Sequence, residues 1–293
     1  MNGALLLIDK DKLRDIIPAI AAEQGFRRAI VEKDYYLTII LNNLHDHLSD
    51  KLVFKGGTLL NKIHLNYHRL SEDLDFSYYG EKDLTNRSGR SAAIAPIKEK
   101  MAGFLAELGL RSDKPKGEGF NNSKQYVFNV FYPSVITGRE GNIKIEVSLR
   151  QKLYDRPVLN VIRHVYKDPF TGRKMIPEHK ILSLSLDEAV AEKLKAAITR
   201  KDPAIRDFYD LWHIAESKFD FSRQHFLKLF KKKLADEGYQ GGFTANFGLN
   251  KDQINLLTRQ IETDLIPVIR VDEVFDLGKV FDRFNVILEG AKT

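Results

Sequence analysis

The first part of the chain shows three apolar patterns of helical period. Over residues 10–24, 28–48 and 91–108, apolar positions recur every three or four residues, as in helices that bury one face. Gly25 stands between the first two patterns and is a typical helix stop. The pattern therefore predicts three helices before residue 110.

Short strand-like runs lie between these helices and after them. Residues 52–54 are all apolar, residues 126–130 are aromatic or β-branched, and residues 142–149 alternate between apolar and polar. The stretch 111–124 is rich in Gly, Lys and Asn and is predicted to be a mobile connection. Strands mixed with helices in this way indicate an α+β core.

Beyond residue 184 the apolar pattern becomes helical almost throughout. The helices expected there cover 186–200, 206–217, 221–234, 252–265 and 271–288. We therefore predict two domains, a mixed core over 1–184 and a helical domain over 185–293 that contributes to the active-site cleft.

The segment 55–79 carries the strongest candidate chemistry. An apolar strand stops at Gly56, Gly57 and Thr58, and a helix begins just beyond them. Two glycines let the backbone approach a ligand closely, and a helix N-terminus offers free N–H groups to phosphate. These residues form a candidate phosphate-binding turn.

Two carboxylates follow on the next predicted strand. Asp73 and Asp75 are two residues apart, so both project from one face of the strand. Glu146 lies on the polar face of the run 142–149, either as a third carboxylate or as a solvent-facing residue of an antiparallel strand. Paired carboxylates near a phosphate-binding turn are what metal-assisted phosphoryl transfer requires.

The helix expected over 186–200 places a lysine in its apolar stripe. At about 100° per residue, Lys193 falls among the apolar side chains, whereas Lys195 points to the opposite side. A buried ammonium is costly unless it reaches water or a partner. Lys193 therefore either extends to solvent or contacts a nucleotide phosphate in a cleft. On the next helix, Asp207 and Asp210 lie opposite the apolar stripe and alone indicate a solvated face.

Composition narrows the class of protein. An apolar content of 43% and a charged content of 29% are typical of soluble globular proteins. The absence of cysteine excludes disulfides and thiolate metal sites and suits a reducing cytoplasm. No run is long enough to span a bilayer, and the N-terminus lacks the features of a signal peptide. We therefore expect a cytoplasmic protein without membrane contact.

The chain is moderately basic, with a formal net charge of +6. The segment 151–180 has many basic residues, and Tyr154, Tyr166 and Phe170 stand among them. This interleaving suits an RNA backbone and exposed bases, although a solvated, strand-rich surface has the same composition. The segment is a candidate RNA-binding surface.

Taken in order, these motifs resemble those of the AbiEii/AbiGii toxin family, which includes the MenT-like nucleotidyltransferase toxins of toxin–antitoxin and abortive-infection systems. The resemblance covers residues 32–212 and rests on a Gly-Gly-Thr turn, an Asp-x-Asp strand, a later Lys and a final Asp. Arg69 and Ser71 lengthen the spacing from turn to carboxylates beyond that of many nucleotidyltransferases. The resemblance implies a polymerase β-like core with a mixed sheet, followed by a helical domain.

The family's functional residues carry over to the matching positions. The resemblance implies catalytic roles for Asp73, Asp75, Lys193 and Asp210, nucleotide binding by Gly56, Gly57, Thr58, Arg69, Ser71 and Lys193, and metal binding by Asp73, Asp75 and Glu146. One or two Mg²⁺ or Mn²⁺ ions are expected. Asp210 acts either as a base or by holding a basic residue in place, and Asp207 is a candidate to orient a neighbouring cation.

The implied reaction is transfer of a nucleoside monophosphate from an NTP to the 3′ end of an RNA such as tRNA, by a toxin with a cognate antitoxin. A metal-dependent nuclease or phosphodiesterase also uses clustered acids, but it explains the Gly-Gly-Thr turn and Lys193 less well. A non-catalytic protein that binds nucleic acid or a partner is the third alternative. The joint retention of the five motif residues argues against it: Gly57, Asp73, Asp75, Lys193 and Asp210.

Overall fold

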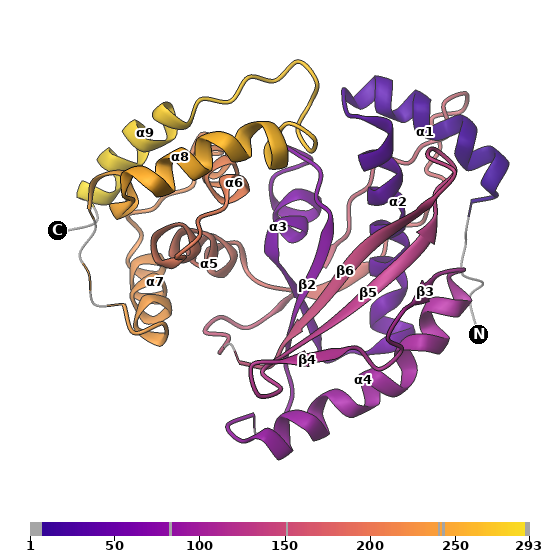
Figure 1. The fold of residues 1–293 in the computed structure, drawn as a ribbon, viewed down its shortest axis with the longest axis horizontal. Helices are drawn as coiled ribbons and strands as arrows, with labels where there is room; N and C mark the ends of the chain where they lie inside the picture. Colours follow the sequence, from indigo (N-terminus) through magenta and orange to yellow (C-terminus); the bar gives the residue numbers. More distant parts are fainter. Residues whose placement is uncertain (1–7, 82–83, 151, 240, 242–243, 291–293) are drawn as a thin grey trace.

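A computed structural model describes residues 8–81, 84–150, 152–239, 241 and 244–290 (Figure 1). The expectation about a signal peptide concerns residues 1–7, which lie outside the described residues. Every helix in the described part is too short or too polar to cross a membrane.

The N-terminal helices begin and end close to where the sequence predicts. Helix α1 (Lys10–Gln24) ends at Gly25, whose φ of 73° is left-handed and costs glycine little. Helix α2 (Arg28–Asn43) continues as the π-helical turn η1 (Leu44–Leu48), so the two together cover the predicted helix. Most residues of α2 are buried, so this helix lies within the hydrophobic core.

An eight-stranded mixed sheet forms the middle of the molecule. Its order is β3-β5-β6-β2-β1-β8-β7, with β4 paired to β5, and the pairs β2–β6 and β1–β8 are parallel. The strands are β1 (Leu52–Lys55), β2 (Asp73–Tyr78), β3 (Arg111–Ser112), β4 (Glu118–Phe120), β5 (Gln125–Pro133), β6 (Glu140–Ser148), β7 (Val158–Val161) and β8 (Lys180–Ser183). Strands β3 and β4 lie in the predicted mobile connection, so that prediction is wrong there. Backbone pairing with β5 holds these short strands without an apolar pattern of their own.

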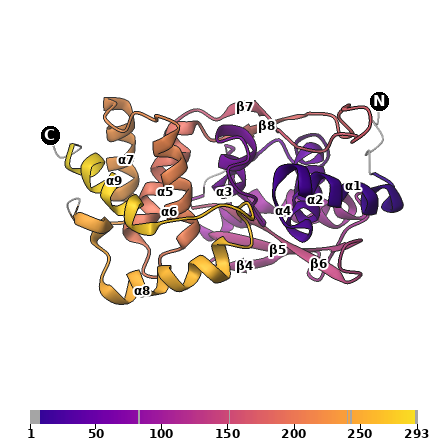
Figure 2. The ribbon, with the colours of Figure 1, turned by 90° about the horizontal axis from the view of Figure 1, so that it is seen from above.

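Helices α2 and α4 (Arg87–Glu107) cover one face of β5 and β6, and Figure 2 shows both helices on the same side of these strands. Tyr132 of β5 stacks on Tyr36 of α2 with ring centroids 4.4 Å apart. Lys98 of α4 places its Nζ 5.1 Å from the ring centroid of Tyr126. The residues that alternate with these on β5 face the opposite way and are only half-buried.

The rest of the chain is helical, as predicted, and its helices gather beside the sheet (Figure 1). Ser185 caps the first of them by accepting a hydrogen bond from the Glu188 backbone N–H. The remaining helices are α3 (Gly56–Leu59), η2 (Leu60–His64), α5 (Leu186–Thr199), α6 (Ile205–Glu216), α7 (Gln224–Asp236), η3 (Ala245–Gly248), α8 (Lys251–Gln260), η4 (Ile261–Leu265) and α9 (Leu277–Gly290). The change from mixed to helical structure occurs between β8 and α5, while the division into two domains stays a prediction.

Candidate active site

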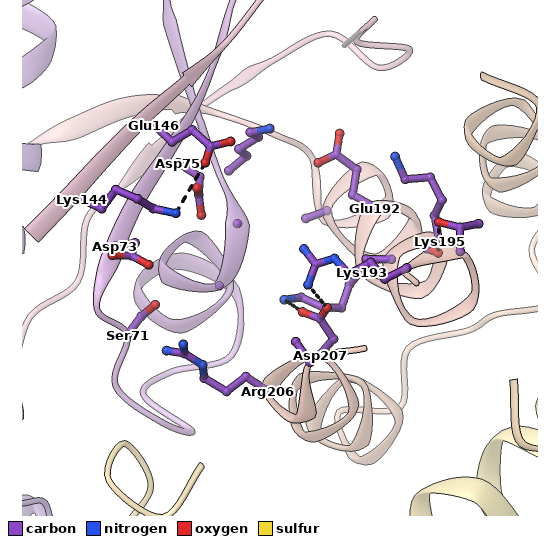
Figure 3. A pocket seen from close by; sticks show the side chains of 18 of the residues that line it. Ser71, Asp73, Asp75, Lys144, Glu146, Glu192, Lys193, Lys195, Arg206 and Asp207 are labelled. Atoms are coloured by element: carbon purple, nitrogen blue, oxygen red, sulfur yellow. Dashed lines mark hydrogen bonds and ion pairs between the residues drawn. The ribbon is translucent and has the colours of Figure 1, made fainter. Parts of the chain in front are cut away.

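A pocket of about 480 Å³ lies between the sheet and helices α5 and α6 (Figure 3). Eight of the predicted site residues line it: Gly56, Gly57, Arg69, Ser71, Asp73, Asp75, Glu146 and Lys193. Sequence reasoning missed further charged lining residues, which are Lys55, Lys144, Arg150, Glu192, Arg200, Arg206 and Glu237. The fold therefore brings most of the predicted site into one cavity.

The sheet wall carries the carboxylates. Strands β2 and β6 are parallel with Asp75 opposite Glu146 and Asp73 opposite Lys144, so all four side chains share one face. Burial raises the pKa of Asp75, Lys55 opposes this effect, and the negative charge of Glu146 adds to it. Lys144 Nζ lies 3.5 Å from Glu146 Oε2. Glu146 thus stands beside the Asp pair on β6, which runs parallel to β2 and antiparallel to β5.

The donor set of this wall fits a hard divalent cation that the substrate helps to hold. Within the described residues there is no cluster of three or more acidic or histidine side chains that could bind a metal by itself. Mg²⁺ commonly binds to one or two carboxylates and completes its coordination with water and substrate phosphates. Asp73 and Asp75 supply such a pair, and their mutual repulsion favours a positive ligand.

The glycine turn is shaped by the side chains that pack against it. Gly56 has a φ of 80°, and a Cβ atom there would collide with Asp75 Oδ2. A Cβ atom at Gly57 would collide with the guanidinium of Arg69. Thr58 is buried and its hydroxyl donates to the Asp73 carbonyl oxygen at 2.5 Å. Both glycines therefore make room for site residues, and Thr58 holds the start of β2.

The helical wall carries a buried network of basic and acidic groups. Arg69 donates to both oxygens of Asp210, with Nε–Oδ1 at 2.6 Å and Nη2–Oδ2 at 2.9 Å. Lys193 Nζ lies 2.9 Å from Asp210 Oδ2 and 2.7 Å from Asp207 Oδ1. Burial favours a high pKa for Asp210, but Arg69 and Lys193 outweigh it and hold the pKa well below its usual value. This geometry favours a role for Asp210 in holding basic residues over a role as a base.

One alternative for this wall is excluded, and one expectation is wrong. Asp207 and Asp210 are both buried and do not form a solvated helix face, because Arg69 and Lys193 occupy the side of α6 that the apolar stripe leaves open. Lys195 does not point away from the site. It lines the same pocket, and its Nζ lies 2.8 Å from Glu237 Oε1 at the end of α7.

Lys193 occupies the cleft that its place in the apolar stripe indicated. Burial disfavours its charged form, but Asp207 and Asp210 outweigh this effect and raise its pKa, so the ammonium stays charged. Arg200 Nη1 approaches the other oxygen of Asp207 at 2.5 Å. The wall thus presents three cations, from Arg69, Lys193 and Arg200, against two carboxylates.

His68 belongs to the same network, and its burial predicts a fold that is sensitive to acid. Its Nε2 lies 2.7 Å from Asp210 Oδ1, and burial lowers the pKa of His68 to about 4. An unfolded histidine titrates near pH 6.5, so the unfolded chain binds more protons below that pH. We expect the free energy of unfolding to fall by about 3 kcal/mol as the pH decreases from about 6.5 to 4.

Urea unfolding at several pH values measures this dependence. His68→Gln keeps a donor near Asp210 but removes the titrating ring, so its unfolding free energy should change less over the same window. Parallel profiles for wild type and variant would assign the acid sensitivity to other groups.

The basic segment after β6 lies apart from the pocket. Among its described residues, 152–180, none lines the cavity. Tyr166 is fully buried, and its hydroxyl donates to the Val31 carbonyl oxygen at 2.7 Å. Tyr166 is therefore core and cannot stack on a base, contrary to expectation, whereas Phe170 is 96% exposed. RNA binding by the charged residues of the segment stays a prediction.

A comparison with protein families shows the family of this chain. The model for the nucleotidyl transferase AbiEii toxin of type IV toxin–antitoxin systems matches residues 39–276. The chain belongs to the AbiEii nucleotidyltransferase toxin family. The AbiEii match confirms the resemblance seen in the motifs and extends it into the C-terminal helices.

Solved structures show the same fold. MenT4, a nucleotidyltransferase toxin from Mycobacterium tuberculosis, superposes with a TM-score of 0.58 at 19% identity, covering 95% of this chain and 97% of MenT4. JHP933 from Helicobacter pylori gives a TM-score of 0.50 at 16% identity, covering 91% of this chain and 93% of JHP933. No curated protein sequence matches the chain. The predicted fold class, a nucleotidyltransferase core with a mixed sheet and C-terminal helices, is thus confirmed for this AbiEii protein.

Proposed function

We propose that this toxin transfers a nucleoside monophosphate from an NTP to the 3′ end of an RNA such as tRNA, with Mg²⁺ or Mn²⁺ as cofactor. The proposal rests on one observation: Asp73 and Asp75 on the sheet face Lys193 on α5 across one pocket (Figure 3). Pockets of about 300–1,000 Å³ are usual for small-molecule ligands, and a nucleotide is of that class.

The two walls of the pocket would have different roles, one for the triphosphate and one for the divalent ion. Arg69 and Lys193 would neutralise charge on the triphosphate, and the backbone amides of the turn at Gly57 would orient it. Asp73 and Asp75 would hold the divalent ion, with Glu146 beside them. Such an ion lowers the pKa of an attacking hydroxyl and stabilises a pyrophosphate leaving group. The acceptor oxygen then forms its bond to the α-phosphorus as the bond to pyrophosphate breaks.

Family membership and charge support the acceptor and the partner. The family consists of toxins of toxin–antitoxin systems, which supports a cognate antitoxin for this chain. The net charge of +6 and the basic pocket residues Lys144, Arg150 and Arg206 support a polyanionic acceptor. An RNA acceptor would place the activity in the cytoplasm. A metal-dependent nuclease explains the clustered carboxylates equally well but the Gly-Gly-Thr turn and Lys193 less well.

Label transfer tests this function directly. Each of the four α-³²P-labelled NTPs is incubated with total RNA and the purified protein, with Mg²⁺ or with EDTA. We expect one or more NTPs to label a small RNA in Mg²⁺ and none to do so in EDTA. Label in protein, or RNA cleavage without incorporation, would contradict the proposal.

A further inference from the structure

Among the residues that the structure describes, no helix lies over one face of the sheet next to the pocket (Figure 2). Strand alternation places the buried residues of β5 and β6 on one side and their polar or half-buried neighbours on the other. On this second side, strands β3, β5 and β6 carry Arg111, Asn129, Phe131, Asn142 and Lys144. Figure 2 shows α2 and α4 on the other side of these strands. The uncovered face is therefore a polar surface with the aromatic rings of Phe131 and, on β4, Phe120, and not a second core.

This uncovered face is continuous with the carboxylate wall. The register places Asp73, Lys144 and Asn129 in one row across β2, β6 and β5. Neighbouring strands lie about 4.8 Å apart, so Asn129 is about 10 Å from Asp73 along this row. A chain that reaches the Asp pair from the side of β6 must cross this face.

The far end of the face carries a prepared stacking surface. The Arg111 guanidinium lies 4.5 Å from the ring centroid of Phe131. Glu140 holds the guanidinium at both ends, with Nε–Oε1 at 2.8 Å and Nη2–Oε2 at 2.5 Å. The Arg111 side chain is 55% exposed, so this fixed plane is open to solvent. Aromatic rings and arginine planes are the surfaces on which proteins stack unpaired RNA bases.

We propose that the single-stranded 3′ end of the acceptor RNA lies on this uncovered face, with a base stacked on the Arg111–Phe131 pair and the backbone beside Lys144. The proposal rests on the proposed function and adds where the acceptor binds. Asn129 and Asn142 offer amide donors and acceptors to base edges. A base within a duplex has both of its faces stacked, so the face selects an unpaired end.

Phe131→Ala and Arg111→Ala test this placement. We expect the KM for an RNA with an unpaired 3′ end to rise about tenfold or more, because stacking contributes that much to single-strand binding. The KM for the NTP should stay unchanged, since neither side chain lines the nucleotide pocket. Arg111 is a surface residue, so Arg111→Ala should fold normally. It can therefore test the placement even if Phe131→Ala folds poorly.

Two matched controls come from exposed side chains that belong to neither the pocket nor the basic segment. Arg14→Ala removes an exposed guanidinium of α1 that is paired with Asp11 at 2.8 Å, and Val274→Ala removes an exposed apolar side chain. Both should leave the KM for RNA unchanged. Provided that the wild type labels RNA, two results would overturn the placement. One is an unchanged KM for RNA in the Arg111 and Phe131 variants, and the other is a larger rise of this KM in the controls than in those variants. A wild type that labels no RNA would instead contradict the proposed function itself.

Discussion

Replacing Asp75 with asparagine is expected to abolish nucleotidyl transfer without lowering the stability of the protein. Burial and the neighbouring Glu146 raise the pKa of Asp75, so its charge is disfavoured in the fold. When folding raises the pKa of a carboxyl group, the folded protein loses stability as the pH rises from the unfolded pKa through the folded pKa. Burial outweighs the opposing attraction from Lys55, so removing the charge at neutral pH should not lower the stability of the metal-free protein. The rate should fall at least about a thousandfold, or about 4 kcal/mol of activation free energy.

Thermal unfolding with and without Mg²⁺ separates the two effects. A ligand that binds only the folded state raises the Tm, so Mg²⁺ with a non-hydrolysable NTP should raise the Tm of the wild type but not of Asp75→Asn. Asp272→Asn changes an exposed carboxylate in the α8–α9 connection and should behave as the wild type. Full transfer activity in Asp75→Asn would remove this residue from the catalytic centre.

Asp210→Asn is expected to give the largest loss of stability in the site. The substitution leaves Arg69 and Lys193 charged and buried with one carboxylate fewer, and breaking such a buried pair costs about 3–5 kcal/mol. The Tm should fall by at least about 6 °C for a chain of this size. Transfer should fall as well, because both cations lose their fixed positions.

Asp207→Asn is the matched control for this loss. Lys193 would keep Asp210, and Arg200 is half-exposed and can be solvated, so the decrease in Tm should be clearly smaller. Differential scanning calorimetry on both variants measures the difference. Equal decreases would show that Asp210 does not carry the network.

Local patterns were enough to predict the sheet side of the site. The alternation in residues 142–149 correctly separated the apolar face of β6 from the face that carries Lys144 and Glu146. The two-residue spacing of Asp73 and Asp75 was enough to place both on one face. In each case the residues that decide the geometry are neighbours in the sequence.

The helical side could not be predicted in the same way, because it depends on contacts between distant segments. The wheel of α6 showed two acids opposite an apolar stripe, and only the approach of Arg69 and Lys193 makes that side buried. Lys195 was misplaced because Glu237, beyond the end of α7, covers it. A helical wheel describes one helix and contains no information about which polar groups pack against it.

The wide separation of the paired site residues has a consequence for synthesis in the cell. Arg69 and Asp210 are 141 residues apart, and Asp75 pairs with Glu146 on a strand made much later. At about 5–20 residues per second, a ribosome needs roughly 7–28 s to pass from Arg69 to Asp210. During that time the nascent chain has the glycine turn and the Asp pair but no second wall. A ribosome-bound fragment that ends before α6 should therefore be harmless, and toxicity should begin only after α6 has been made.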